Sequence, residues 1–277
     1  EIRTPLNAII GMLELVLARK GDAEQNHQLA HIAYESAISL LALIGDILDI
    51  SRIEAGKLSL ELEPVKVKDL LESVGKVFSG LARQKQLRLS LSIDERAAQL
   101  VWVDAVKLKQ IVSNLLGNAI KFTHRGGVEL RCSVEVAGDS GLRFDISVID
   151  TGVGIPAAQL DQIFKPYRRV DGVVSDPNAG AGLGLTISQA LCLLMGSKLN
   201  VKSTVGSGTR IDFSVTLARV MVDAVAQSSI ESSENTATVL TVLIVEDHLP
   251  SQYLLVQQIG YLGHRTLTAC NGLEGQI

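Results

Sequence analysis

The segment Asp150-Thr-Gly-Val-Gly154 decides the fold of this chain, together with the glycine segments Gly180-Ala-Gly-Leu-Gly184 and Gly206-Ser-Gly-Thr209. An Asn-x-x-x-Asn pattern at Asn114 and Asn118 precedes them. Glycine lacks a side chain, so backbone N–H groups can wrap phosphate oxygens, while asparagine and aspartate supply oxygens for Mg²⁺ or a base edge. One Gly-x-Gly is usually only a turn. Four such elements in this order predict a nucleotide site.

The order and content of these segments resemble the ATP-binding domain of sensor histidine kinases, part of the wider fold shared with Hsp90 and gyrase. Asn114-Leu-Leu-Gly-Asn-Ala-Ile-Lys-Phe-Thr123 resembles the N box of that family, and Asp150-Thr-Gly-Val-Gly-Ile-Pro156 its first glycine box. Ile163-Phe-Lys-Pro-Tyr167 resembles the F box, and the residues from Gly180 to Ile187 resemble the second glycine box. As a set the matches are specific, and the resemblance covers nearly the whole chain.

Composition and charge are those of an ordinary globular protein. The 277 residues have room for about two domains, with 47% hydrophobic and 20% charged residues. The net charge is −4 and basic residues are scattered, which argues against a nucleic-acid partner. Cys132, Cys192 and Cys270 are odd in number and far apart, so we expect a reducing compartment and thiols that are small buried apolar groups.

The sequence has no stretch of 18 consecutive apolar residues and its N-terminus is not that of a signal peptide, so we expect no membrane contact here. Glu1 falls inside a motif of the resembled family, which implies an intact protein that continues upstream. The resemblance places this part in the cytoplasm and the parent protein in the bacterial inner membrane.

Two helices are predicted at the start of the chain. Residues 1 to about 20 place apolar side chains at helical spacing, Gly21-Asp22 ends that stripe, and a second helix from about Glu24 to Ala55 stops at Gly56. Long seams on two antiparallel helices favour pairing with a second copy into a four-helix bundle, hence a homodimer; contact with the following domain is the alternative. The stripe residues are Leu6, Ile9, Ile10, Leu13 and Leu17, and the seam residues are Leu29, Ala33, Ser36, Leu40, Leu43, Ile47 and Ile50.

After Pro64 the pattern changes to alternating helix and strand. Helices are predicted over Val67–Gly80 and Val106–Phe122, and another begins near Leu185. Strands are predicted over Leu87–Ile93, Val128–Val136, Leu142–Ile149, Lys198–Ser203 and Arg210–Leu217. We expect an antiparallel sheet covered by helices, an α/β sandwich.

A linker and a second fold follow. Val222–Thr238 is a linker by composition. Val242-Leu-Ile-Val-Glu-Asp-His248 with the following amphipathic segment resembles the opening of a response-regulator receiver domain. A receiver needs roughly 100 or more residues, so we expect this piece to be poorly packed or disordered. In a complete receiver, Glu246 and Asp247 would bind Mg²⁺.

The predicted organisation is therefore an α+β multidomain chain. Residues 1–62 form a helical hairpin for dimerisation and histidine phosphotransfer, and 63–219 an α/β sandwich ATP-binding domain of the histidine kinase, Hsp90 and gyrase type. Residues 220–238 are the linker, and 239–277 the truncated receiver.

The resemblance also implies a phosphorylated histidine immediately before Glu-Ile-Arg-Thr-Pro, and here Glu1-Ile-Arg-Thr-Pro5 opens the chain. The phospho-acceptor histidine would therefore stand one residue before Glu1, outside the given sequence. Glu1 resembles the general base of the family, which accepts a ring proton from the imidazole. Thr4 would lie on the same helical face as the acceptor and orient water for dephosphorylation. None of the histidines present has this context: His27, His31, His124, His248 and His264.

The resemblance implies ATP and Mg²⁺ as cofactors. Asn118 is the expected Mg²⁺ ligand and Asn114, one turn earlier, supports the metal or water shell. Lys121 would neutralise phosphate charge. Buried asparagines that only satisfy backbone groups are the structural alternative.

Asp150 resembles the residue that accepts a hydrogen bond from the adenine amine, although a turn-forming aspartate is possible. Gly152 and Gly154 permit the loop beside it, and Thr209 closes the adenine side. The second glycine box, Gly180, Gly182 and Gly184, would frame the phosphates. Arg168–Ala179 should be a lid that orders with nucleotide. Tyr167 replaces the usual Phe of the F box, which adds a hydroxyl.

Three functions compete. The first is the catalytic core of a hybrid sensor histidine kinase, which transfers the ATP γ-phosphoryl group to a histidine and then to its own receiver or a separate response regulator. The second is an Hsp90- or gyrase-like ATPase, disfavoured because those enzymes carry a glutamate base where this chain has Asn114. The third is a nucleotide-binding interaction module without turnover. We expect this polypeptide to bind Mg-ATP without phosphorylating itself.

Overall fold

The computed structural model describes residues 2–18, 23–138, 140–166, 182–220 and 239–275. The chain forms two compact units, Glu1–Met221 and Val222–Ile277, which are described separately.

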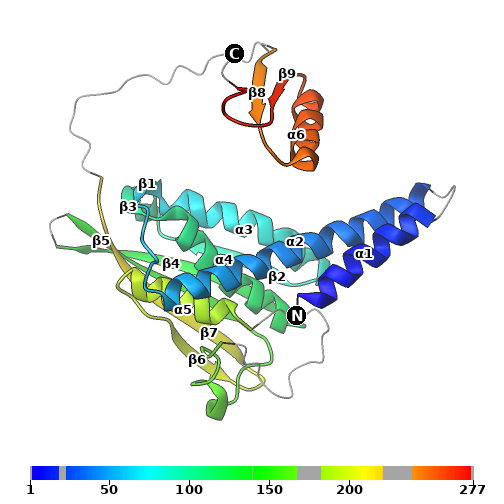
Figure 1. Cartoon of the computed structure of the whole chain (residues 1–277). Coiled ribbons are helices and arrows are strands. Elements are labelled where there is room, and N and C mark those ends of the chain that lie inside the picture. The colour runs from blue at the N-terminus through cyan, green and yellow to red at the C-terminus, as the bar shows by residue number, and fades with distance from the viewer. Residues whose placement is uncertain (1, 19–22, 139, 167–181, 221–238, 276–277) are drawn as a thin grey trace. The chain divides into compact units, whose positions relative to one another are not determined.

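The first unit begins with a helical hairpin. Helices α1 (Arg3–Ala18) and α2 (Ala23–Glu54) pack side by side and antiparallel (Figure 1). Helix α2 ends two residues before Gly56, whose φ of +63° suits glycine and whose amide donates to Ile53 O. This confirms Gly56 as the stop signal. Ala33 is the buried centre of the hairpin, and much of its outer surface stays apolar and exposed.

The predicted seam of α2 has two different partners. Near its middle, Ala33 is buried in the hairpin. Toward the C-terminal end, Ile47 and Ile50 pack against the core of the following domain, and Asp49 Oδ2 accepts a 2.8 Å hydrogen bond from Gln110 Nε2. The last two turns of the seam therefore contact the next domain, which is the alternative left open by the sequence.

The rest of the unit is a sheet with helices on one face (Figure 1). Its elements are β1 (Glu63–Lys66), α3 (Val67–Gln84), β2 (Arg88–Ile93), β3 (Leu100–Val103), α4 (Ala105–Phe122), β4 (Gly127–Ala137), β5 (Gly141–Asp150), α5 (Gly184–Leu194), β6 (Asn200–Thr204) and β7 (Gly208–Ala218), with short 3₁₀ turns at Glu95–Ala98 and Ala157–Gln159. The pair β1 and β3 forms a separate two-stranded antiparallel sheet, which the sequence analysis did not predict.

The main sheet is mixed, so the expectation of an antiparallel sheet was wrong. Its order is β2-β4-β5-β7-β6, and β2 runs parallel to β4 while the other neighbours are antiparallel. The reason is the crossover between β2 and β4, which contains α4. A helix in the connection returns the chain to the same end of the sheet, whereas a tight turn would reverse it.

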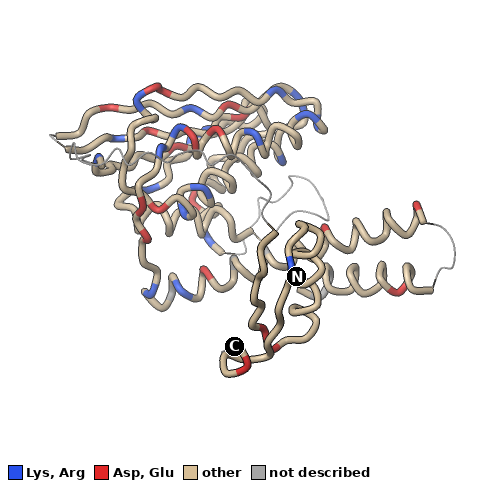
Figure 2. The backbone as a smooth tube through the Cα atoms, turned by 90° about the horizontal axis from the view of Figure 1, so that it is seen from above, with Lys and Arg blue, Asp and Glu red and all other residues tan. Residues whose placement is uncertain are grey.

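Alternation along the strands builds the core. In β4, Val128, Leu130, Cys132 and Val134 are buried while the residues between them face solvent, and β5 and β7 repeat the pattern. Helices α3, α4 and α5 cover the buried face. On the outer face, opposite charges lie beside each other along β4, β5 and β7, as in Arg131 with Glu129 and Arg210 with Asp212. Figure 2 shows both signs interspersed over this domain, without a basic patch.

The expectation that the cysteines are buried apolar groups holds for two of the three residues. Cys132 and Cys192 are buried in the core, and burial raises the pKa of each thiol to about 12. Cys270, in the second unit, is exposed.

The second unit contains β8 (Thr241–Val245), α6 (Leu249–Tyr261) and β9 (Arg265–Ala269), with β8 parallel to β9. Its described residues therefore form regular structure, which corrects the expectation of disorder. Its packing is sparse, since only Ile244 and Ala269 are buried and no described residue of α6 is. No helix in the described part of the chain is both long and apolar enough to cross a bilayer.

Candidate functional site

Helix α4 presents the two asparagines of the N box. Its apolar face, including Leu108, Ile111 and Leu115, is buried against the sheet, and this fixes the rotation of the helix. Asn114 and Asn118, one turn apart and half-buried, therefore share another face. Asn114 Nδ2 donates to Gly184 O and to Ser188 Oγ, each at 3.3 Å. Asn118 makes no hydrogen bond to another described residue, so its carboxamide is available to a ligand.

The C-terminal end of α4 is held by side chains that satisfy its last carbonyl groups. Thr123 Oγ1 donates to Ala119 O at 2.6 Å, and Lys85 Nζ donates to the carbonyl oxygens of Ile120 and Lys121 at 3.2 Å each. The ammonium of Lys121 lies 5.3 Å from the ring centroid of Phe122. These contacts fix the end of the helix from which Lys121 projects.

Asp150 is the last residue of β5 and faces Thr209 across the β5–β7 ladder. Its Oδ1 accepts from the amides of Gly152 at 2.8 Å and Thr209 at 3.2 Å, while Oδ2 has no hydrogen-bond donor among the described residues. Burial raises the pKa of Asp150, although the two amide hydrogen bonds oppose that shift. The carboxylate is thus oriented by one oxygen and can accept from a ligand with the other.

The first glycine box is packed between α4 and the β6–β7 turn. The Val153 amide donates to Phe122 O at 3.2 Å, and its carbonyl accepts from the Gly206 amide at 2.8 Å. A Cβ on Gly152 would lie 2.4 Å from Phe122 O, and one on Gly154 would lie 2.1 Å from Thr204 O. Gly154 also has a φ of +72°. Only glycine fits at these two close approaches.

The second glycine box opens α5. Gly182 has a φ of +69°, and the first helical residue, Gly184, packs against the carboxamide of Asn114. Thr186 Oγ1 donates to Phe164 O at 3.0 Å, which ties the helix start to the F box. A helix N-terminus next to the asparagine face offers free amides and a positive dipole end to phosphate.

The structure therefore joins the predicted residues into two linked groups. One contains Asn114 and Gly184, and the other contains Asp150, Gly152 and Thr209; the C-terminal end of α4 connects them through the Phe122–Val153 hydrogen bond.

Several predicted residues are not in this arrangement. Glu1, Gly180, Tyr167 and the predicted lid Arg168–Ala179 lie outside the described residues, and Thr4 lies in the first turn of α1 with a side chain that is not described. Glu246 and Asp247 belong to the second unit and follow β8, where Glu246 Oε1 accepts from the His248 amide. No cluster of three or more His, Cys, Asp or Glu side chains in the described ranges could hold a metal by itself.

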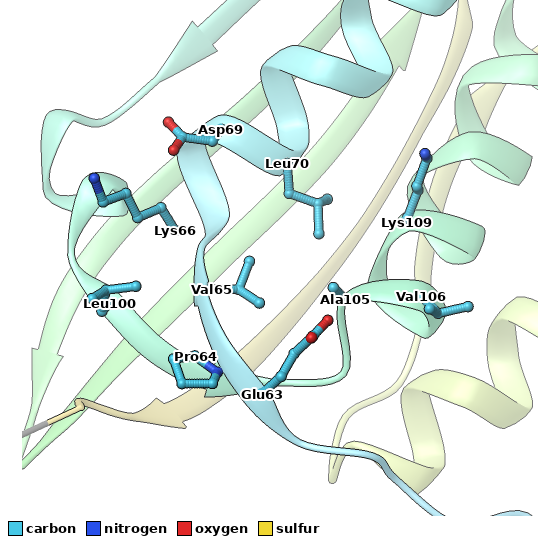
Figure 3. A pocket seen from close by; sticks show the side chains of 10 residues that line it. All are labelled: Glu63, Pro64, Val65, Lys66, Asp69, Leu70, Leu100, Ala105, Val106 and Lys109. Carbon is cyan, nitrogen blue, oxygen red and sulfur yellow. The ribbon is translucent and has the colours of Figure 1, made fainter. Parts of the chain in front are cut away.

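Two hollows of the first unit lie away from the N box and the two glycine boxes. One of about 540 Å³ is lined by β1, the starts of α3 and α4, and Leu100 (Figure 3). Another of similar volume is lined by Leu160, Phe164 and strand β6. Neither contains a residue predicted to bind nucleotide, so the site is identified by its chemistry and motif contacts rather than by an enclosed cavity.

Sequence reasoning missed three supporting residues: Lys85, Ser188 and Ser203. Ser188 is fully buried against Asn114, and Ser203 accepts from the Ile155 amide at 2.8 Å. A polar residue in an apolar helix face was the available signal for Ser188. Nothing in the sequence marked Lys85 or Ser203 as a site residue, because a lysine at a helix end and a serine in a strand are usually only exposed to solvent.

The comparisons with known proteins agree with this arrangement. The phospho-acceptor domain of histidine kinases matches residues 1–56, and the histidine kinase-, DNA gyrase B- and HSP90-like ATPase domain matches residues 103–219. The chain belongs to the sensor histidine kinases. The phospho-acceptor domain precedes the ATPase-like domain in this chain.

Similar proteins include a virulence sensor protein and a signal transduction histidine-protein kinase. The virulence sensor protein BvgS of Bordetella bronchiseptica is 46% identical over 279 aligned positions, which cover 98% of this chain and 22% of that protein. The signal transduction histidine-protein kinase BarA of Escherichia coli K12 is 36% identical over 217 positions, 78% of this chain and 24% of that protein. The chain thus spans about a quarter or less of these relatives.

A solved structure shares the fold. Full-length ShkA, crystallised in complex with AMPPNP, aligns with a TM-score of 0.60 and 29% identity over 99% of this chain and 54% of that one. The Acinetobacter baumannii histidine kinase AdeS has a TM-score of 0.56 at 23% identity, covering 79% of this chain and 96% of its own, and supports the fold alone. An α/β sandwich that follows a helical hairpin is therefore confirmed, and membership of the ATPase-like domain family supports ATP binding.

Proposed function

We propose that the chain is the catalytic core of an ATP-dependent protein histidine kinase that transfers the γ-phosphoryl group to a histidine on the helical hairpin. The observation that carries the proposal is the geometry of Asp150. Amides fix one carboxylate oxygen and leave the other to accept from the exocyclic amine of adenine.

The phosphate end of ATP would meet α4 and α5. Asn118 would bind Mg²⁺ together with phosphate oxygens and waters, since Mg²⁺ keeps several waters and takes few protein ligands. The residues present fit the ion, because Asn118 offers a half-buried carboxamide without a described partner. It lies one turn along α4 from Asn114, which contacts Gly184 at the start of α5. Bound Mg²⁺ would neutralise triphosphate charge, and Lys121 would add to that neutralisation. Asn114 would hold α4 against α5.

Transfer to histidine is favoured over hydrolysis. Activation of water by a side chain needs a base beside the γ-phosphate. Asn114 is an amide, has no basic carboxylate, and already donates to Gly184 O and Ser188 Oγ. Glu1 is proposed as the base that accepts the imidazole proton, and Thr4 as a residue that orients water in dephosphorylation.

The partners follow from the same proposal. We infer a homodimer through the hairpin, and phosphate transfer to a receiver, either that of its own chain or that of a separate response regulator. This part would act in the cytoplasm, and the parent protein would lie in the bacterial inner membrane.

The test compares three proteins in Mg²⁺ and radiolabelled ATP: the chain as given, the chain with a histidine placed directly before Glu1, and that extended chain with Asn118→Asp. Acid-labile, base-stable label is expected on the second protein alone. Equal label on the chain as given would contradict the proposed acceptor. Unlabelled protein that still binds Mg-ATP in the extended form would contradict the kinase activity.

A further inference from the structure

The Ser203 hydroxyl on strand β6 stands at the centre of the adenine side of the site. Its Oγ accepts from the Ile155 amide at 2.8 Å, donates to Gly208 O at 3.0 Å, and lies 2.9 Å from Thr209 Oγ1. It therefore joins the first glycine box, the β6–β7 turn and Thr209.

Counting protons assigns a direction to the bond between the two hydroxyl groups. A hydroxyl has one proton and two acceptor lone pairs. The Gly208 carbonyl can only accept, so it takes the single proton of Ser203, and the Ile155 amide can only donate, so it uses one lone pair. The remaining lone pair of Ser203 faces Thr209 Oγ1, and Thr209 must donate its proton to it.

This direction decides what Thr209 offers to a ligand. Thr209 is 9% exposed and faces Asp150 across the ladder, on the same side of the sheet. With its proton turned toward Ser203, Thr209 Oγ1 presents lone pairs only, as does Asp150 Oδ2. Together these atoms form a surface that accepts hydrogen bonds and repels a carbonyl oxygen.

We propose that Ser203 is a specificity-determining positioning residue: it directs the Thr209 proton inward and so makes the base site select a purine with an amine at carbon 6 over one with a carbonyl there. The inference rests on the proposed ATP binding. Without the Ser203 hydroxyl, Thr209 can rotate and donate to a carbonyl, so selectivity should relax.

The experiment measures binding of Mg-ATP and Mg-ITP to the full chain, because ITP differs from ATP in carrying a carbonyl at that carbon. The variants are Ser203→Ala and Ser203→Thr, with Ser214→Ala as the matched control, since Ser214 also lies on the sheet and bonds the carboxylate of Asp145. The ratio of ITP to ATP dissociation constants should fall roughly 5–10-fold in Ser203→Ala, the size of one net hydrogen bond. It should stay near the wild-type value in Ser203→Thr and Ser214→Ala.

Equal weakening of both nucleotides in Ser203→Ala, with an unchanged ratio, would overturn the inference, because that is the result of a purely structural role. In a Thr209→Val background, Ser203→Ala should leave the ratio unchanged; a further fall there would also overturn it. If Ser203→Ala does not fold, Ser203→Cys carries the same test, since sulfur is a weak acceptor for the Thr209 proton. A wild-type chain that binds neither nucleotide would instead refute the proposed function.

Discussion

At the scale of single residues, Asp150 combines a cost in stability with a role in binding. Burial raises its pKa, so its ionised form is disfavoured in the folded protein. Its geometry is nevertheless fixed by the Gly152 and Thr209 amides. A carboxylate held in this way is typical of a recognition residue, because the fold alone would be served as well by an uncharged side chain.

Asp150→Asn should therefore raise stability and weaken ATP binding. The raised folded-state pKa means that wild-type stability falls as pH rises from the unfolded-state pKa through the folded one. The thermal midpoint of the variant should exceed that of wild type at pH 7–8, and the gain should vanish in acid. ATP affinity should fall about 10–100-fold, because a charged acceptor is lost. Thermal melts and calorimetry on both proteins would refute this if the variant melted lower and bound ATP equally well.

At the scale of elements, helix α4 is anchored at its start by Asp104, which is 2% exposed. Oδ1 accepts from the Lys107 amide at 3.0 Å, and Oδ2 accepts from Lys107 Nζ at 2.6 Å and from the Glu61 amide at 2.9 Å. Burial alone would raise the pKa of Asp104, but the hydrogen bonds from Lys107 and Glu61 outweigh it and lower the pKa. One carboxylate thus caps the N-box helix and fixes the segment before β1.

Asp104→Asn should destabilise the protein by about 1–3 kcal/mol at pH 7. A depressed folded-state pKa gives stability that is present above the unfolded-state pKa and is lost as pH falls through the folded one. The difference from wild type should therefore shrink in acid. Urea unfolding at neutral and acidic pH checks this, with Asp69→Asn, an exposed acid in the first turn of α3, as the control. Equal effects of the two substitutions at pH 7 would count against the anchoring role.

The elements that sequence predicts well are those whose pattern is long and local. The apolar face of α4, the alternation in β4 and β5 and the stop at Gly56 all follow from spacing. Strand direction is different, because alternation is the same in parallel and antiparallel strands; the parallel pairing of β2 follows only from the α4 crossover. The β1–β3 pair is four residues per strand and gives too short a pattern.

Some residues of the candidate site could be predicted from the sequence, and others could not. Glycines and asparagines were found because their residue types are unusual in strands and apolar helices. Ser203 was missed because its role depends on Ile155, Gly208 and Thr209, which only folding brings to it.

At the scale of the whole molecule, the hairpin has an apolar surface that the other described residues of the first unit leave exposed. The outward residues recur at helical spacing on both helices, and Figure 2 shows few charged residues along them. They include Leu6, Ile10, Leu13 and Leu17 on α1, with exposed fractions of 43, 47, 45 and 85%, and Ile38, Leu41 and Leu48 on α2, with 49, 65 and 53%. A second copy is the partner that would bury both rows at once.

Substituting charged residues into this apolar surface should dissociate the proposed dimer into single chains. Wild type should have twice the chain mass of 29.6 kDa in light scattering, and the double variant Leu41→Glu, Leu48→Glu should have the single mass. ATP affinity should be unchanged, because neither residue belongs to the nucleotide site. Val77→Glu, at a residue 66% exposed on α3, is the matched control and should remain dimeric. A wild-type mass of one chain would contradict the dimer.

We propose that the carboxamides on α4, backbone amides and the Asp150 carboxylate at the end of β5 bind magnesium-chelated ATP. Calorimetric titration of the chain with Mg-ATP, beside its Asn118→Asp variant, tests it most directly. We expect saturable binding to the wild type and a large loss of affinity in the variant, whose added negative charge would face the triphosphate. No binding to the wild type, or identical titrations of the two proteins, would contradict it.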